Sequence, residues 1–146
     1  MIYLIRICIF IFIFSFSSHA NETGENKILF KVNNKIFTNL DFERRVKYVE
    51  LINNIKFEKI EESNKQEILE DYVSSLIFYE YNKDNNVIKE NISSEIQKFF
   101  DTRILKEEKK INLNDQEILN IKNNIRIDLI RNKMTEFFLN SNKSIL

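Results

Sequence analysis

The side chains best suited to nucleophilic, redox or metal chemistry are confined to the first twenty residues. The 146-residue chain has one cysteine, Cys8, and one histidine, His19. Thiolate and imidazole groups serve Cys/His zinc sites, haem ligation and Ser-His or Cys-His catalysis. Beyond residue 20 the sequence therefore lacks the residues for any of these sites, and it has no cysteine for a disulfide.

Phosphate-binding loops are also missing from the sequence. Gly24 is the only glycine, and both the GxGxxG fingerprint and the Walker loop need several glycines where backbone approaches phosphate. Carboxylate-only catalysis, as in glycosidases, stays formally possible, but nothing in the pattern indicates the large cleft that it uses. We therefore expect no catalytic residues, no cofactor, no metal site and no enzymatic activity.

The charges are balanced and interleaved. The chain has 22 Lys and Arg residues against 22 Asp and Glu residues. Acidic and basic residues alternate closely in KFEKIEESNKQEILED (56–71) and RILKEEKK (103–110). Because a nucleic-acid-binding protein concentrates a basic surplus on one face, we expect no nucleic-acid partner.

Residues 1–20 have the pattern of a secretory signal peptide. Arg6 precedes an apolar stretch at residues 7–14, and Ser18 and Ala20 place small side chains at the −3 and −1 positions of a cleavage site. The apolar stretch is shorter than the about 20 residues that a membrane span needs. The pattern predicts cleavage after Ala20, and an uncleaved membrane anchor is the alternative.

The chain beyond the predicted signal begins with a β-hairpin. Residues 21–26 are polar and are expected to form a disordered leader. In KILFKVNNKIFT (27–38), β-branched and aromatic residues flank Asn33-Asn34, and Asn tolerates the left-handed conformation of a tight turn. Thr38 then fits the N-cap of a helix, with Asp41 reaching back as in a capping box.

Four or five amphipathic helices are predicted to follow the hairpin, and they must pack on one another to bury their apolar faces. The first ends near Asn53-Asn54, and the charged residues 56–65 form a connection. The second runs from about residue 64 to residue 83, with a broad apolar stripe made of Ile68, Leu69, Tyr72, Val73, Leu76 and Ile77. The fold class is thus mainly α, with an N-terminal hairpin, in one domain at 27–140 before a tail at 141–146.

The later helices are predicted from start patterns. Ser93 is expected to cap a third helix, whose apolar face continues to Ile104. Asn114 with Glu117 indicates a fourth start. Two rotated apolar stripes follow, so the segment either breaks near Asn123-Asn124 or forms a long helix buried on two sides; we favour the break.

Residues 32–41, VNNKIFTNLD, resemble the start of SurA-type periplasmic chaperones. QEILEDYVSSLIFYEYNK (66–83), ISSEI (92–96) and IDLIRNKM (127–134) are similar to later helices of that family, in the same order. The resemblance covers about residues 27–138. It implies a helical domain like the N-terminal chaperone domain of that family, which binds unfolded outer-membrane or secreted polypeptides in the periplasm without ATP.

The same resemblance limits the activity that is expected. The chain ends where the family's first parvulin domain would begin, and it lacks the histidines of a parvulin prolyl-isomerase site. We therefore expect the chaperone module alone, located in the periplasm, or anchored to the inner membrane and facing the periplasm if the signal is not cleaved. Apolar surface that the family covers with a C-terminal segment could then bind clients, a second copy or a separate partner.

Aromatic residues on the helices are the candidate client-binding residues. A holdase needs an exposed apolar groove with a polar rim. Adjacent helical residues point about 100° apart, so one member of an aromatic pair can face the core while the other faces a groove. Core packing is the competing interpretation for each of the candidates, which are Phe78, Tyr79, Tyr81, Phe99, Phe100, Phe137 and Phe138.

Two alternatives complete the predictions. The chain could be a structural or adaptor subunit that forms an obligate complex through an exposed apolar face, or an enzyme remnant of the isomerase lineage, which the missing parvulin region disfavours.

Asp41, Arg44 and Arg45 could form a functional charge cluster. We expect instead that Asp41 caps its helix and that both arginines lie on the solvent face.

Overall fold

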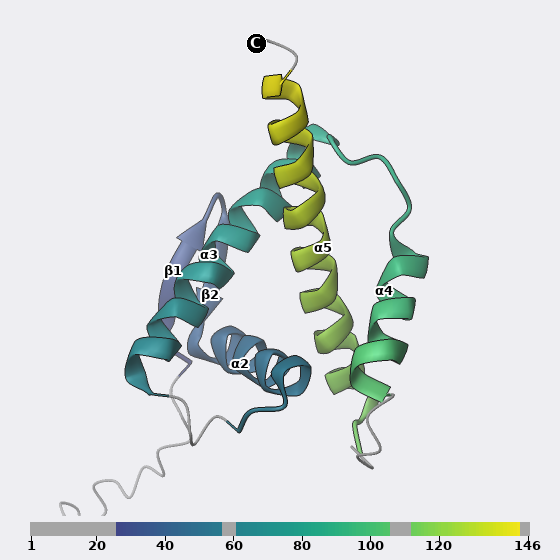
Figure 1. Cartoon of the computed structure of the whole chain (residues 1–146). Helices are drawn as coiled ribbons and strands as arrows, with labels where there is room; N and C mark the ends of the chain where they lie inside the picture. Colours follow the sequence, from purple (N-terminus) through teal and green to yellow (C-terminus); the bar gives the residue numbers. More distant parts are fainter. Residues whose placement is uncertain (1–25, 57–60, 106–111, 144–146) are drawn as a thin grey trace, which may run out of the picture.

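The computed structural model of the protein describes residues 26–56, 61–105 and 112–143. The predicted signal peptide and almost all of the predicted leader lie outside these residues. The described part is mainly helical with an N-terminal two-stranded hairpin (Figure 1), as the sequence predicts. None of its helices combines the length and the apolar content that crossing a membrane requires.

The hairpin consists of β1 (Ile28–Val32) and β2 (Lys35–Thr38), which pair antiparallel. Asn33 in the turn has φ of 52°, the left-handed conformation expected for this position. Two contacts hold the hairpin against the helix at Glu62–Asn85: Lys35 Nζ lies 2.6 Å from Oε1 of the buried Glu80, and the Asn33 side chain donates to Asp84 at 3.2 Å. The hairpin therefore has a fixed position on that helix.

Helix α2 (Asn39–Asn53) begins and ends where the sequence predicts. The backbone N–H and the hydroxyl of Thr38 both donate to Oδ2 of Asp41, at 3.0 and 2.9 Å. Asn54 ends the helix in the left-handed conformation. Asparagine takes this role because its short polar side chain tolerates that region, which glycine otherwise serves.

Helix α3 (Glu62–Asn85) is longer than predicted at both ends, and Asn86 caps it in the left-handed conformation. Helix α4 (Ser93–Phe99) continues into a π-helical segment, η2 (Phe100–Leu105). Ser93 is the first residue of α4 and not its N-cap, which corrects the prediction. The helix starts one residue early because Asn91 Oδ1 accepts the Ser93 backbone N–H at 3.0 Å.

Helix α5 (Asp115–Lys143) is one continuous helix, so the predicted break near Asn123-Asn124 is wrong. Its start is as predicted: Asn114 and Glu117 exchange two hydrogen bonds of 2.9 Å between side chains and backbone N–H groups. The helix stays unbroken because it packs on α2, α3 and α4, so both of its apolar stripes are covered. It also includes residues 141–143, which were predicted to be part of the tail.

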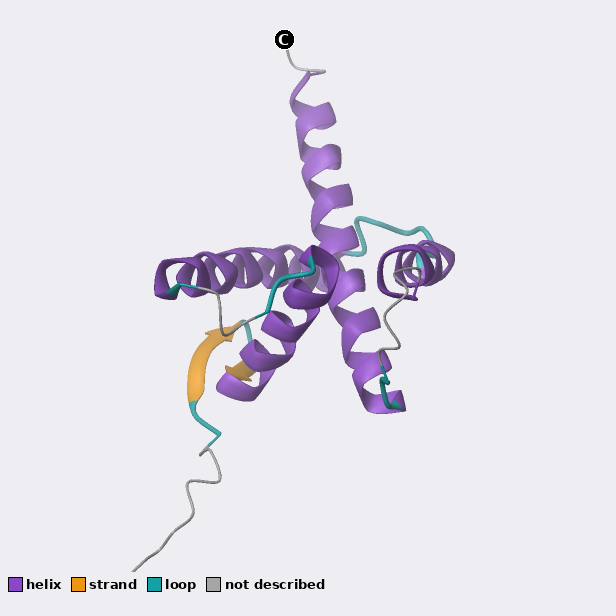
Figure 2. Cartoon of the chain, turned by 60° about the horizontal axis from the view of Figure 1, so that its bottom comes forward, coloured by secondary structure: helices purple, strands orange, loops and turns teal. Residues whose placement is uncertain are grey.

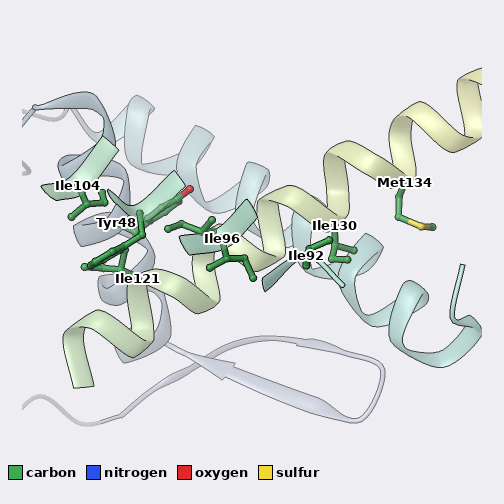
Figure 3. Close-up of a cluster of buried hydrophobic side chains, with 9 residues drawn as sticks. Tyr48, Ile92, Ile96, Ile104, Ile121, Ile130 and Met134 are labelled. Atoms are coloured by element: carbon green, nitrogen blue, oxygen red, sulfur yellow. The ribbon is translucent and has the colours of Figure 1, made fainter. Parts of the chain in front are cut away.

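Two hydrophobic clusters form the core. The larger joins α4, η2 and α5 around Tyr48 of α2 (Figure 3), and it is made of Tyr48, Ile92, Ile96, Phe100, Ile104, Ile121, Ile125, Ile130 and Met134. The smaller lies beneath the hairpin and joins Val32, Tyr72, Leu76 and Ile127. Because α5 contributes to both clusters, it connects the two halves of the fold.

Candidate polypeptide-binding surface

Four of the seven predicted aromatic residues meet in one surface cluster. Phe78 and Tyr81 project from α3, and Phe137 and Phe138 from α5. The ring centroid of Phe138 lies 6.4 Å from that of Phe78, 6.3 Å from that of Tyr81 and 5.6 Å from that of Phe137. Tyr81, Phe137 and Phe138 are exposed and Phe78 is half-buried, so the cluster faces solvent.

The other three candidates do not join this surface. Phe100 is only 3% exposed and packs in the larger cluster, so core packing is the correct interpretation for it. It follows Ile96 by one helical turn and therefore points the same way, into the core. Phe99 and Tyr79 are half-buried and pack against the clusters.

A hollow of about 500 Å³ lies between β1 and α3. Its apolar lining is Leu29, Phe30, Leu69, Val73, Ile77 and Phe78, and its polar lining is Gln66, Glu70 and Ser74. The apolar spacing of this helix predicts a buried stripe that includes Leu69, Val73 and Ile77. Ile77 is instead 53% exposed, because the core covers only the face of α3 that carries Tyr72 and Leu76.

An irregularity in β1 shapes the hollow. The strand register shifts between Ile28 and Phe30. In a regular strand successive side chains point to opposite faces, and a bulge breaks that alternation. Here the consecutive residues Leu29 and Phe30 both line the hollow. The bulge thus adds one apolar side chain to the lining.

The hollow and the aromatic cluster form one continuous apolar surface, because Phe78 belongs to both. We call this surface the α3 strip; it consists of Leu29, Phe30, Leu69, Val73, Ile77, Phe78, Tyr81, Phe137 and Phe138. From Leu69 to Tyr81 the helix rises about 18 Å. An extended segment of roughly five or six residues has the same length.

An ionic cluster around the buried Arg45 joins α2, α3 and α5. Arg45 is 2% exposed, and its Nη2 lies 2.8 Å from Asp71 Oδ2 and 2.9 Å from Asp128 Oδ1. Asp71 also pairs with Arg131, and the Tyr48 hydroxyl donates to Asp128 Oδ2 at 2.9 Å. The prediction that Arg45 lies on the solvent face is therefore wrong.

The position of Arg45 along α2 indicates that its side chain is buried. Arg45 follows Phe42 by three residues and precedes Val49 by four, so it lies on the face that those residues bury. Its guanidinium also lies over the rings of Tyr48 and Tyr72, 5.1 and 5.3 Å from their centroids. The prediction for Arg44 holds: it is exposed and donates to Asp41 at 3.2 Å.

The environment of this cluster shifts the pKa values of Arg45, Asp71 and the two neighbouring tyrosines. Burial opposes the charge of Arg45, but Asp128 and Asp71 outweigh it and hold the pKa of Arg45 above its usual value. Burial likewise opposes ionisation of Asp71, yet hydrogen bonds from Arg131 and Arg45 lower its pKa. Burial raises the pKa of Tyr72 to about 12. Near neutral pH Arg45 and Asp71 are therefore charged and Tyr72 is neutral, and the ion pairs of Arg45 join the three helices.

A second hollow of about 590 Å³ lies beside this cluster, between α2, α3 and α5. Its lining mixes the charges of Arg45, Asp71, Asp128 and Arg131 with apolar side chains of α2 and α3. Residues 57–60, which join these two helices, lie outside the described part. This hollow is therefore not taken as a candidate site. Within the described ranges, no three His, Cys, Asp or Glu side chains are grouped so as to hold a metal ion.

Comparison of the chain with protein-family models, curated proteins and solved structures gives no match. The resemblance to SurA-type chaperones thus rests on the residues quoted for it and on the order of the predicted elements.

Proposed function

We propose that this protein is an ATP-independent periplasmic chaperone that binds unfolded outer-membrane or other envelope polypeptides along the α3 strip. The observation that carries the proposal is the continuity of this strip across β1, α3 and α5, with Phe78 shared by the hollow and the aromatic cluster. Large contiguous apolar surfaces are rare on soluble proteins and mark interaction sites.

The chemistry of the strip suits clients of many sequences. Its contacts are aliphatic and aromatic, with Gln66, Glu70 and Ser74 as polar groups at the hollow. Apolar contact depends on the area buried and has little directional requirement. Such a strip would bind many extended apolar segments with similar affinity, as a holdase requires.

The proposed location and the lack of an ATP requirement rest on the sequence. The pattern of residues 1–20 favours export, and a chain with one glycine has no phosphate-binding loop. The ionic cluster around Arg45 supports the proposal in another way, because it joins α3 and α5, which carry most of the strip, to α2. A fixed surface loses less conformational entropy on binding than a flexible one.

The alternative function is an adaptor that holds one obligate partner. One observation favours it: the C-terminal turns of α5 extend beyond the other helices (Figure 2) and carry the exposed Phe137, Phe138 and Leu139. A projecting apolar helix end suits insertion into a single partner. Holdase and adaptor differ in the number of clients that they accept.

The test is suppression of aggregation. A urea-unfolded outer-membrane β-barrel protein is diluted with and without the protein purified after expression of the full chain, while light scattering and the mass of any complex are recorded. We expect scattering to fall at near-stoichiometric ratios, without ATP, for two unrelated client proteins. Unchanged scattering with a folded, self-associated protein would overturn the holdase proposal and favour the adaptor.

A further inference from the structure

We infer that the free edge of β1 binds a client segment as an added β-strand whose apolar side chains occupy the hollow between β1 and α3. The inference rests on the proposed function and deepens it, because it specifies the conformation and the charge pattern of the bound segment. Strand addition supplies backbone hydrogen bonds that do not depend on client sequence.

The edge is available in the part of the chain that the structure describes. The sheet has two strands in the order β1–β2, so the edge of β1 remote from β2 pairs with no other described strand. β1 is the outer strand of the hairpin, and β2 lies on the side of α2 (Figures 1 and 2). In an antiparallel pair, every second residue turns its N–H and C=O away from the partner strand.

The hollow adjoins the strand that carries this edge. Leu29 and Phe30 of β1 form one side of it, and Leu69, Val73 and Ile77 of α3 form the other. A strand added beside β1 would direct every second side chain toward α3. Those side chains would fill the hollow, and the backbone of the client segment would form hydrogen bonds with the free N–H and C=O groups of β1.

The exposed Lys31 of β1 determines which residues suit the face of the bound segment that points away from the hollow. Lys31 is exposed, while the neighbouring Val32 is buried and Phe30 half-buried on the core side. No described acidic side chain lies within ion-pair distance of Lys31. Opposite charges on neighbouring strands stabilise pairing, so the segment that fits alternates apolar residues with acidic ones.

The same lysine disfavours a second copy of this chain as the occupant. Two β1 edges pairing antiparallel would bring two Lys31 side chains onto one face, where like charges repel. Lysine and bulges on an edge strand protect a sheet against self-pairing, and β1 has both. A client segment with acidic residues would instead attract Lys31. This charge complementarity favours a client over a second copy.

The probe is a fluorescein-labelled eight-residue peptide that alternates Val or Phe with Glu. Its anisotropy is titrated with the protein purified after expression of the full chain. Two further peptides replace every Glu by Lys, or carry N-methyl groups that remove the backbone donors along one edge. We expect the Glu peptide to bind most tightly and N-methylation to weaken it at least about tenfold, because several backbone hydrogen bonds are lost.

A charge exchange locates the site. Lys31→Glu is expected to weaken the Glu peptide and to strengthen the Lys peptide, each by about fivefold, since one attraction becomes a repulsion. Lys98→Glu, at another exposed lysine with no described ion pair, is the matched control and should change neither affinity. Circular dichroism verifies that both variants are folded.

Each remaining outcome contradicts the inference in a distinct way. If N-methylation and Lys31→Glu change nothing while Ile77→Ser weakens the peptide, clients bind the α3 strip without strand addition and only the proposed function stands. If no peptide binds and aggregation is not suppressed, both fall. Slow hydrogen exchange at the β1 edge without peptide would show that the edge is already covered, by a second copy if sedimentation finds a dimer.

Discussion

The ring centroid of Phe78 lies 6.4 Å from that of Phe138, and the two ring planes are inclined at 48°. This contact links the middle of α3 to the end of α5, two segments far apart in the sequence. Phe78 also lines the hollow beside β1. Phe78 therefore joins the hollow and the aromatic cluster, each of which would be a smaller apolar surface alone. The extended α3 strip depends on this residue.

Replacing Ile77 by Ser should weaken client binding with little loss of stability. Ile77 is half exposed at the centre of the strip, and losing about 1 kcal/mol of apolar burial in the complex lowers affinity roughly fivefold. The aggregation assay measures the effect as a higher ratio of protein to client for half suppression. Leu119→Ser is the matched control, because Leu119 is equally exposed near the other end of α5. Equal losses in both variants would contradict a localised strip.

Phe138→Ala should remove the ring contacts that join α3 to the end of α5 in the aromatic cluster. Phe138 contacts Phe78, Tyr81 and Phe137, and each aromatic pair contributes about 0.5–1.5 kcal/mol beyond its buried area. We expect a fall of a few degrees in the thermal midpoint, followed by circular dichroism, together with weaker client binding. Leu139→Ala, at a more exposed neighbour, should change the midpoint little. An unchanged midpoint for Phe138→Ala would mean that the cluster does not order the end of α5.

Arg45→Met should destabilise the fold by about 3 kcal/mol, because it leaves Asp128 without its buried partner cation. Urea unfolding at neutral pH measures this loss. Adding Asp128→Asn to the variant should restore part of the stability, since the uncompensated charge is removed. Arg44→Met, on the exposed side of the same helix, is the control and should lie within about 0.5 kcal/mol of the native protein. Equal effects at the two arginines would contradict a structural role for the ionic cluster.

Asp71 should make stability depend on acid pH. Hydrogen bonds from Arg131 and Arg45 outweigh burial and hold the pKa of Asp71 below its usual value. The ionised form is thus favoured in the folded state, so its contribution is present above about pH 5 and is lost as pH falls through the folded pKa. Asp71→Asn should have a lower urea midpoint at pH 7, and its difference from the native protein should shrink by pH 3.

The control for this pH dependence is Asp101→Asn, at an exposed aspartate on η2 whose described partner is Gln97. Its urea midpoint should follow that of the native protein at both pH values. A difference between Asp71→Asn and the native protein that stays constant from pH 7 to pH 3 would show that ionisation of Asp71 does not contribute to stability.

The local features of this protein follow from short stretches of its sequence. The hairpin at Asn33, the Thr38–Asp41 cap and the Asn114–Glu117 start all follow from interactions among residues a few positions apart. Such interactions depend on the side chains involved and on backbone geometry, which the sequence specifies directly. The mainly helical class follows in the same way from apolar periodicity.

Which apolar and charged faces are covered depends on the packing of segments that are distant in the sequence. The burial of Arg45 depends on carboxylates from α3 and α5, the continuity of α5 depends on helices packed on two of its sides, and the exposure of Ile77 depends on where the hairpin lies. The sequence identifies the aromatic residues, but it does not show that Phe100 lies in the core and Phe78 in the surface strip. Periodicity shows that a helix has an apolar face, whereas the neighbour that covers this face is set by contacts between distant segments.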